Sequence, residues 1–318
     1  MKDEFEFIQN LRKKYSLNLI GDDCAVLPKN DESDMVVTAD MLVEDIDFRL
    51  DWTIAEFLGH RALAVSLSDI AAMGATPTWS ILSIGLPEII WHSNFLDEFY
   101  AGWHSLAVKF NVELVGGDIS RTPDKIVIDS VVGGDVPRGK AILRSGANAG
   151  DLVVVTGSFG GAAGGLKLLE AGRTILGSSG PEHELMDRQL RPMPQISFAK
   201  DIRDSPGVSA MIDISDGLSS DFTHLCSASN VGARIFSERI PTDPNLSVLE
   251  LDRRQELDLA LHGGEDFELL FTAGPKTISD FESADFSVIG EITSTPRVIE
   301  LIRDGQTEIL ESKGYRHF

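Results

Sequence analysis

Carboxylates stand at several points of this sequence where the surrounding pattern predicts burial. Asp40 interrupts the apolar run 35–43, and Asp213 and Asp216 lie at the end of a strand predicted over 208–214. At about 100° per residue, Asp69 falls on one of two apolar faces of a helix predicted over 53–73. An ionised carboxylate in such a place is costly unless a cation or several hydrogen-bond donors compensate its charge.

Other carboxylates follow glycines, which let a ligand approach the backbone closely. Asp22 and Asp23 follow Gly21, and one layout, glycines and then a carboxylate, is shared by Gly116-Gly117-Asp118, Gly133-Gly134-Asp135 and Gly263-Gly264-Glu265-Asp266. Oxygen ligands suit Mg²⁺, which a few carboxylates usually hold together with substrate phosphates. Thr38, on the same strand face as Asp40, could add a hydroxyl. Each aspartate taken singly could instead form a cap or a turn, so it is the set that predicts a magnesium and phosphate site.

The glycine-rich segment 156–165 follows a predicted strand and opens a helix, where backbone N–H groups could meet an anion. It contains neither GxxxxGK[ST] nor GxGxxG, which excludes a P-loop and a dinucleotide-binding turn of the usual kind. Close packing of the helix on the strand is the favoured role of these glycines.

Nucleophilic catalysis finds no support in the sequence. No GxSxG, HExxH or CxxC pattern occurs, and the seven histidines are scattered. Cys24 lies beside Asp22 and Asp23, but neighbouring carboxylates raise the pKa of a thiol and oppose thiolate chemistry. We therefore expect no catalytic nucleophile or general base from the protein.

Alternating strands and helices must position these residues. Strands are predicted over 35–43, 78–86, 112–116, 125–132, 152–156, 208–214, 232–237 and 267–272, with a terminal hairpin around Asp304-Gly305. Helices are predicted over 4–14, 53–73, 94–110, from the glycine-rich turn to about 172, and over 182–205 (broken at 191–194), 217–229 and 252–262. Thr53 is expected to cap the second helix and Gly74 to end it. The small, polar segment 144–151 is the best domain boundary, so we expect two α/β domains, 1–143 and 144–318.

Charge and composition limit the partners. The chain has 318 residues, with 28 Lys and Arg against 50 Asp and Glu, a formal net charge of −22. This excess repels phosphate backbones and anionic lipids, so neither nucleic acid nor a membrane is an expected partner. Two cysteines without paired spacing fit a reducing compartment, and neither a signal peptide nor an apolar run of roughly 20 residues is apparent. We expect a cytoplasmic protein.

Eight blocks follow one another along nearly the whole chain. They are Gly21-Asp22-Asp23-Cys24-Ala25, Thr38-Ala39-Asp40, Ser68-Asp69-Ile70-Ala71-Ala72-Met73-Gly74-Ala75, Gly116-Gly117-Asp118, Arg144-Ser145-Gly146-Ala147, Asp213-Ile214-Ser215-Asp216-Gly217, Gly263-Gly264-Glu265-Asp266-Phe267-Glu268-Leu269 and Gly314-Tyr315-Arg316-His317-Phe318. In these blocks the sequence resembles the thiamine-monophosphate kinase family, within the PurM-like superfamily of aminoimidazole-ribotide synthetase and selenophosphate synthetase.

The resemblance implies a two-domain PurM-like fold of the α/β class (α+β type). Its N-terminal domain, a mixed sheet with helices, would bind ATP and metal and form a homodimer, and its C-terminal α/β domain would complete the active site. The implied reaction is ATP-dependent phosphorylation of thiamine monophosphate to thiamine diphosphate with several Mg²⁺ ions, by direct in-line transfer.

The resemblance also implies roles for individual residues. Metal contacts fall on Asp23, Thr38, Asp40, Asp69, Asp118, Asp213 and Asp216. ATP contacts fall on Tyr100, Gly117, Asp118, Arg144 and Ser215, and substrate contacts on Asp47, Glu265 and Tyr315. The family often has His where Asp47 stands and Thr where Ala39 stands.

The chemistry of the residues agrees with this activity. A phosphate-monoester acceptor, whose second pKa is near 6, is largely a dianion at neutral pH and needs no general base. Two polyanions must instead be brought together, which a magnesium–carboxylate cluster can do. Two alternatives stay open: another member of the superfamily that activates a different acceptor with ATP, and a non-catalytic Mg²⁺- or nucleotide-binding protein of the same fold.

Overall fold

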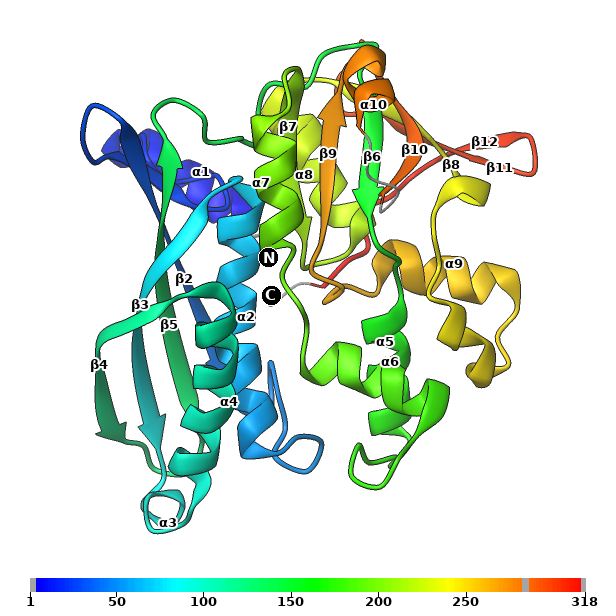
Figure 1. Cartoon of the computed structure of the whole chain (residues 1–318). Helices are drawn as coiled ribbons and strands as arrows, with labels where there is room; N and C mark the ends of the chain where they lie inside the picture. Colours follow the sequence, from blue (N-terminus) through cyan, green and yellow to red (C-terminus); the bar gives the residue numbers. More distant parts are fainter. Residues whose placement is uncertain (1–3, 282–285, 316–318) are drawn as a thin grey trace.

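The computed structural model describes residues 4–281 and 286–315, which form two sheets with helices between and around them (Figure 1). No helix in these residues is long and apolar enough to cross a membrane. The two cysteines, Cys24 and Cys226, are buried free thiols.

The N-terminal sheet has five strands in the order β1-β2-β5-β3-β4. Their bounds are β1 Ala25–Pro28, β2 Ser33–Val43, β3 Thr76–Leu86, β4 Glu113–Arg121 and β5 Val127–Pro137. β3 and β4 run parallel and the other neighbours antiparallel, so the sheet is mixed, as predicted. Helices α2 (Ala55–Ala72) and α4 (Phe95–Phe110) lie on one face, and α1 (Glu4–Tyr15) and α3 (Glu88–Trp91) lie at its ends (Figure 1).

The C-terminal sheet has seven strands in the order β12-β11-β8-β10-β6-β9-β7. Their bounds are β6 Leu152–Thr156, β7 Val208–Ile214, β8 Gly232–Phe236, β9 Glu268–Ala273, β10 Phe286–Thr293, β11 Ile299–Arg303 and β12 Gln306–Ile309. The helices are α5 Gly161–Glu170, α6 Gly180–Leu190, α7 Ile196–Asp204, α8 Leu218–Ser229, α9 Arg253–His262 and α10 Pro275–Asp280, with 3₁₀ turns η1 Ser237–Arg239 and η2 Pro244–Leu249. β8 and β11 are parallel.

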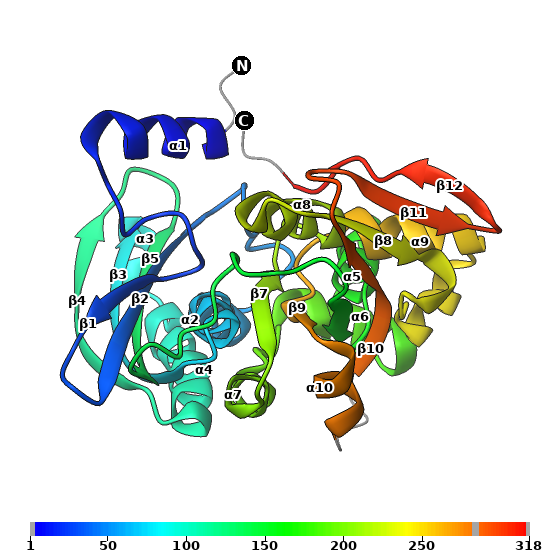
Figure 2. The same ribbon diagram turned by 90° about the horizontal axis from the view of Figure 1, so that it is seen from above.

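Helix α2 lies between the two sheets, with β2 and β5 on one side and β7 on the other (Figure 2). Leu58, Leu63, Leu67 and Ile70 are fully buried around it, which confirms the prediction of a helix that is apolar on two faces. Any charged side chain on such a helix must find a partner within the protein.

Two glycines let α2 and α4 approach each other closely. A Cβ atom on Gly59 would lie 1.8 Å from the Phe99 carbonyl oxygen, and one on Gly102 would lie 1.8 Å from the Glu56 carbonyl oxygen. Any larger residue at either position would force the helices apart.

Most predicted elements are confirmed, and several details differ, among them two short helices, α3 and α10, that were not predicted. Thr53 does not cap α2: the cap position is Ile54, and the Thr53 hydroxyl donates to the Ile54 carbonyl at 3.3 Å. β4 continues past the predicted residue 116 to Arg121, since it pairs along β3. Two strands escaped prediction. β1 has only 4 residues, and β10 contains an irregularity between Val288 and Gly290 that breaks its alternation.

Candidate functional site

Three aspartates from separate elements meet where the two sheets face α2. Asp23 precedes β1, Asp69 lies in the last turns of α2, and Asp213 is next to the end of β7. One carboxylate oxygen of each lies within 4.8 Å of the other two. The fold thus gathers residues from sequence positions nearly 200 apart into one buried acidic cluster, which we call the aspartate cluster.

Hydroxyl donors orient part of the aspartate cluster. The Thr38 hydroxyl donates to Asp69 Oδ2, and the Ser68 hydroxyl donates to Asp213 Oδ2 at 2.6 Å. Beside them, Asp40 accepts a 2.7 Å hydrogen bond from Ser66. Asp23 Oδ2, by contrast, is buried and has no hydrogen-bond partner in the described residues.

The aspartate cluster is short of positive charge. Burial raises the pKa of Asp69 well above its ordinary value, and repulsion from Asp40, Asp213 and Asp23 raises it further. Burial and the neighbouring Asp23 raise the pKa of Asp213 to about 7, and burial raises that of Asp40 to about 6. Buried carboxylate oxygens in mutual repulsion, one of them without any donor, fit the hard oxygen-ligand set of a divalent cation.

Arg144 brings a guanidinium to the edge of the aspartate cluster. Its Nε and Nη2 lie 3.1 and 2.5 Å from Asp23 Oδ1. Its backbone N–H donates to Asp22 Oδ1 at 3.1 Å, and burial followed by the charge of Asp23 raises the pKa of Asp22 to about 6. Arg144 lies in the linker between the sheets, so its guanidinium reaches the point where both domains meet.

The loop after β7 carries Ser215 and Asp216 and is fixed by one buried carboxylate. Asp221 Oδ2 accepts hydrogen bonds from the backbone N–H groups of Ser215, Asp216 and Gly217 at 3.1, 3.1 and 3.0 Å. Gly217 has φ +119°, which favours glycine. Ligand atoms of Asp216, Asp221 and His224 also gather within 4.8 Å of one another.

A pocket of about 440 Å³ opens beside the aspartate cluster. Six predicted site residues line it: Asp40, Asp47, Ser215, Asp216, Glu265 and Tyr315. Trp52 and Phe48 add aromatic surface. Acidic groups together with aromatic faces suit a ligand with a cationic ring.

The C-terminal segment reaches this pocket through Tyr315. Its backbone N–H donates to the Asp216 carbonyl at 3.0 Å, and burial together with the charges of Asp47, Glu265 and Asp216 raises the pKa of its hydroxyl. Tyr315 is 47% exposed, so part of the residue is open to the pocket. The rest of the terminal block, 316–318, lies outside the described residues.

Asp47 uses its carboxylate locally. Its Oδ2 accepts the Val43 backbone N–H at 2.8 Å, which holds the turn after β2.

Three predicted ATP or metal contacts do not reach the aspartate cluster within one chain. Gly117 and Asp118 lie on the exposed edge strand β4. Strands β5 and β3 lie between β4 and β2, so β4 is about 14 Å from β2 at the usual strand spacing. Tyr100 lies on α4 near Gly59, and Gly59 is ten residues, about 15 Å, along α2 from Asp69.

Several residues that shape the site were not predicted from the sequence: Arg61, Ser66, Ser68, Gln189 and Asp221. A pattern was present for Arg61. It is a charged residue on a helix with two apolar faces, and it falls beside Leu58 and Val65 on the face that carries Asp69.

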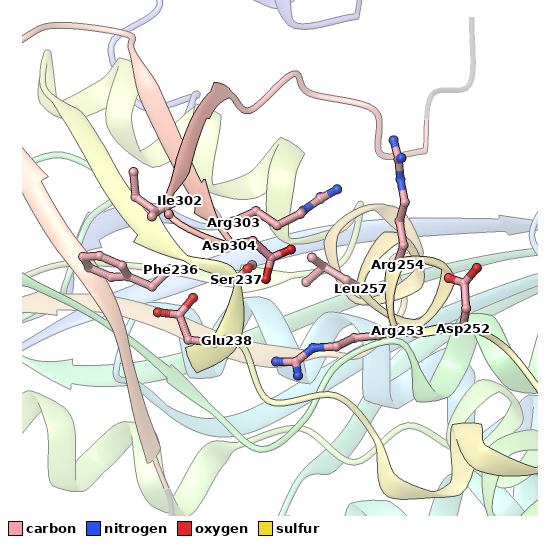
Figure 3. Close-up of a pocket in the computed structure, with 11 residues that line it drawn as sticks. Phe236, Ser237, Glu238, Asp252, Arg253, Arg254, Leu257, Ile302, Arg303 and Asp304 are labelled. Atoms are coloured by element: carbon pink, nitrogen blue, oxygen red, sulfur yellow. The ribbon is translucent and has the colours of Figure 1, made fainter.

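A larger hollow, of about 770 Å³, lies at the carboxyl ends of β8 and β11 beside the start of α9 (Figure 3). Its charges balance, since it is lined by Arg253, Arg254, Arg303, Glu238, Asp252 and Asp304. Asp252 already caps α9, and Arg303 pairs with Glu308 at 3.2 Å. None of the predicted site residues lines this hollow, so its size does not locate the chemistry.

Comparison with family models finds two adjacent matches. Residues 21–136 match the AIR synthase related protein, N-terminal domain, and residues 148–302 match the AIR synthase related protein, C-terminal domain. Together the matches span most of the chain, and each contains strands of one of the two sheets.

Curated relatives and solved structures agree with these matches. The thiamine-monophosphate kinase of Salmonella typhimurium is 37% identical over 307 residues, 94% of this chain and 91% of its own length. That of Bacillus subtilis is 34% identical over 328 residues, 99% of each chain. The solved structure of AaThiL complexed with AMPPCP and TMP superposes with a TM-score of 0.88 at 32% identity, covering 99% of this chain and 97% of the other.

Proposed function

This chain belongs to the AIR synthase related family and, within it, to the thiamine-monophosphate kinases. We therefore propose that its site binds ATP and thiamine monophosphate side by side for phosphoryl transfer. It is a thiamine-phosphate kinase, and it phosphorylates thiamine monophosphate to thiamine diphosphate with ATP as co-substrate. The observation that carries this proposal is the juxtaposition of the aspartate cluster with a pocket of acidic and aromatic residues.

The aspartate cluster would hold the metal. Asp23, Asp69 and Asp213, with Thr38 and Asp40 beside them, are the oxygen donors we propose for several Mg²⁺ ions. When bound, these ions would neutralise phosphate charge on both substrates. Asp216, on the loop after β7, is a further donor on the pocket side.

The chain's own residues would position the two phosphates. Arg144 and the loop at Ser215 border the aspartate cluster and are proposed to contact ATP. Glu265, Tyr315 and Asp47, which line the pocket, are proposed to contact the thiamine moiety. We propose direct in-line transfer: an oxygen of the acceptor phosphate bonds to the γ-phosphorus as the bond to the β–γ bridging oxygen breaks, and ADP leaves. The acceptor is a dianion, so no side chain needs to remove a proton.

A homodimer built on the N-terminal sheet is the assembly we propose. Large apolar side chains are exposed along β2, β3 and β4: Met41, Ile81, Leu114, Val115 and Ile119. Pairing of two copies would cover them. It is also the arrangement in which the contacts predicted on β4 and α4 could reach an aspartate cluster that they do not reach within one chain.

We further propose the domain division 1–143 and 144–318, since the linker around Arg144 separates the two sheets. A cytoplasmic location is proposed because both cysteines are free thiols, which a reducing compartment maintains.

A mass-spectrometric assay of the full chain with MgATP tests the activity. Thiamine monophosphate is offered beside acceptors of the related synthetases, and thiamine diphosphate is the expected product. Turnover of ATP with another acceptor alone would indicate a different superfamily member. The absence of ATP turnover with every acceptor would indicate a binding protein.

A further inference from the structure

We propose that Arg61 and Gln189 are positioning residues that hold one oxygen of Glu265 and thereby present its other oxygen to the substrate ring. Arg61 Nη2 and Gln189 Nε2 both donate to Glu265 Oε2, the latter at 3.1 Å. No donor in the described residues reaches Glu265 Oε1 within hydrogen-bond distance. A carboxylate held in this way has one lone-pair edge committed to the protein and one left for a ligand.

Arg61 joins three separate segments. It lies on α2 and is 3% exposed. Its Nη1 donates to the Gln189 carbonyl at the end of α6, and its Nη2 also lies 3.3 Å from the Asp47 carbonyl. The same guanidinium therefore contacts two of the three chain segments that carry the proposed thiamine contacts, those at 47 and 265. A planar fork with five donors can span these acceptors, whereas a lysine ammonium cannot.

The backbone also holds Glu265 in place. Its φ is +62°, an uncommon value for a residue with a side chain, and it follows Gly264 at φ +69°. Its N–H donates to the Ser215 carbonyl at 2.7 Å, which ties it to the loop after β7. A residue held in this region of φ costs free energy and persists only where its surroundings determine it. The conformation and the two side-chain donors together fix where Glu265 Oε1 points.

Glu265 reaches the pocket with a partly exposed side chain. The Glu265 side chain is 34% exposed and lines the pocket with Tyr315 and Asp47. Its carboxylate would accept from an N–H donor on a ring that also carries positive charge, which is the chemistry of an aminopyrimidine joined to a thiazolium. This assignment rests on the proposed function and adds the residues that determine how the ring is recognised.

A buried arginine could instead serve stability alone, since removing one partner of a buried ion pair is destabilising. The two roles predict different coupling between the effects of changing Arg61 and of changing Glu265. A residue that acts through Glu265 loses its effect on substrate affinity once Glu265 no longer carries the charge, whereas a stabilising residue does not.

A double-mutant cycle separates these roles. KM for thiamine monophosphate and for ATP, kcat and the melting temperature are measured for Arg61→Gln, Glu265→Gln and the double variant. Each single change should raise KM for thiamine monophosphate by about 10- to 100-fold, the worth of a charge-assisted hydrogen bond, with KM for ATP little changed. The double variant should have a KM for thiamine monophosphate no higher than that of the more impaired single variant. Multiplicative effects of the two changes would overturn the proposal.

A milder variant covers the case in which Arg61→Gln does not fold. Gln189→Met removes only the amide donor to Glu265 and leaves the Gln189 carbonyl for Arg61. It should raise KM for thiamine monophosphate several-fold, less than Arg61→Gln does, because the charged donor from Arg61 remains on Glu265 Oε2. It should have no effect when Glu265 is already Gln. An unchanged KM in the wild-type background would contradict the role of Gln189 and with it the positioning pair.

The matched control is Arg191→Gln, which removes another arginine near α6. Arg191 pairs with Asp187 at 2.6 Å and stacks on Phe57 outside the pocket. The Arg191→Gln variant should leave both KM values unchanged. A rise in KM for thiamine monophosphate equal to that of Arg61→Gln would assign the effect to loss of positive charge in general. If the wild-type protein forms no thiamine diphosphate, the proposed function fails. If it does form thiamine diphosphate and the effects of the two changes on KM multiply, only this inference fails.

Discussion

The Ser68 hydroxyl donates to Asp213 Oδ2 at 2.6 Å, and this contact joins α2 of the N-terminal half to the end of β7 in the C-terminal half. The next residue along α2, Asp69, brings its own carboxylate within 4.8 Å of Asp213 and Asp23. Neither sheet holds this set alone. The aspartate cluster therefore exists only while the two halves pack on each other around α2.

Asp69→Asn should lower kcat by orders of magnitude and weaken activation by Mg²⁺. The change removes charge from the centre of the aspartate cluster, where the phosphate charge must be neutralised. Initial rates titrated with Mg²⁺ measure the effect, and Asp97→Asn, on the exposed start of α4, is the control. Near-wild-type activity at limiting Mg²⁺ would remove Asp69 from the site.

Asp118→Asn should also lower kcat by orders of magnitude, although Asp118 lies on the edge strand far from the aspartate cluster of its own chain. If Asp118 acts across a dimer, mixing this variant with Asp69→Asn after dissociation should restore part of the activity, because some mixed dimers contain one intact site. An active Asp118→Asn variant would exclude the residue, and the absence of restoration would exclude sharing between copies.

Arg144→Lys should raise KM for ATP and leave KM for thiamine monophosphate nearly unchanged. Two nitrogens of the guanidinium reach Asp23 Oδ1 at 3.1 and 2.5 Å, and a lysine cannot reproduce this fork geometry on a carboxylate or a phosphate. Steady-state kinetics with each substrate varied in turn provide the measurement. Unchanged kcat and KM for ATP would leave Arg144 as a structural linker residue.

Tyr315→Ala should raise KM for thiamine monophosphate by roughly 2- to 30-fold, the worth of a cation–π or ring contact of about 0.5–2 kcal/mol. The ring lines the pocket and is half exposed. KM for ATP and the melting temperature should change little, and Tyr315→Phe should be nearly silent, because the ring face makes the contact. An intact KM in Tyr315→Ala would move the aromatic contact elsewhere in the pocket.

The metal-free protein should lose stability as the pH rises from about 4 to about 7. Burial raises the pKa of Asp213 to about 7 and that of Asp40 to about 6, against 3.8 for the free side chain. The folded state thus binds more protons than the unfolded state in this window, and the free energy of unfolding falls as they dissociate.

Addition of Mg²⁺ should counter this loss. When free Mg²⁺ is at about 100 times Kd, each ion bound adds about 2.7 kcal/mol to the free energy of unfolding, which raises the melting temperature by a few degrees. Thermal unfolding across the pH range, with EDTA or with Mg²⁺, measures both effects. A melting temperature that rises with pH in EDTA, or that ignores Mg²⁺, would contradict the metal assignment.

The sequence predicted the aspartate cluster because a carboxylate inside an apolar run is itself an anomaly. Asp69 lies on an apolar helix face and Asp213 at the end of a buried strand, and both belong to the cluster; Asp40, which interrupts an apolar run, lies beside it. The third member, Asp23, stands out in the sequence only because it follows Gly21. Arg61 is the same kind of anomaly on the same helix, but its partner Glu265 is 204 residues away, and nothing local indicates that pairing.

Other differences between prediction and structure come from long-range pairing. β1 is too short to show a periodic pattern, and β10 lacks a regular alternation because of its irregularity at Val288. The proposed roles of Tyr100 and Asp118 rest on family resemblance. A single chain's folding pattern does not predict contacts that would form only between copies.

Isotope transfer in a single turnover tests the central claim most directly. The full chain is mixed with Mg²⁺, thiamine monophosphate and ATP labelled with ¹⁸O on the γ-phosphate, and the products are analysed by mass spectrometry. We predict thiamine diphosphate that carries the label in its terminal phosphate, together with unlabelled ADP, and almost no product from Asp69→Asn. Labelled inorganic phosphate with unchanged thiamine monophosphate would contradict the account.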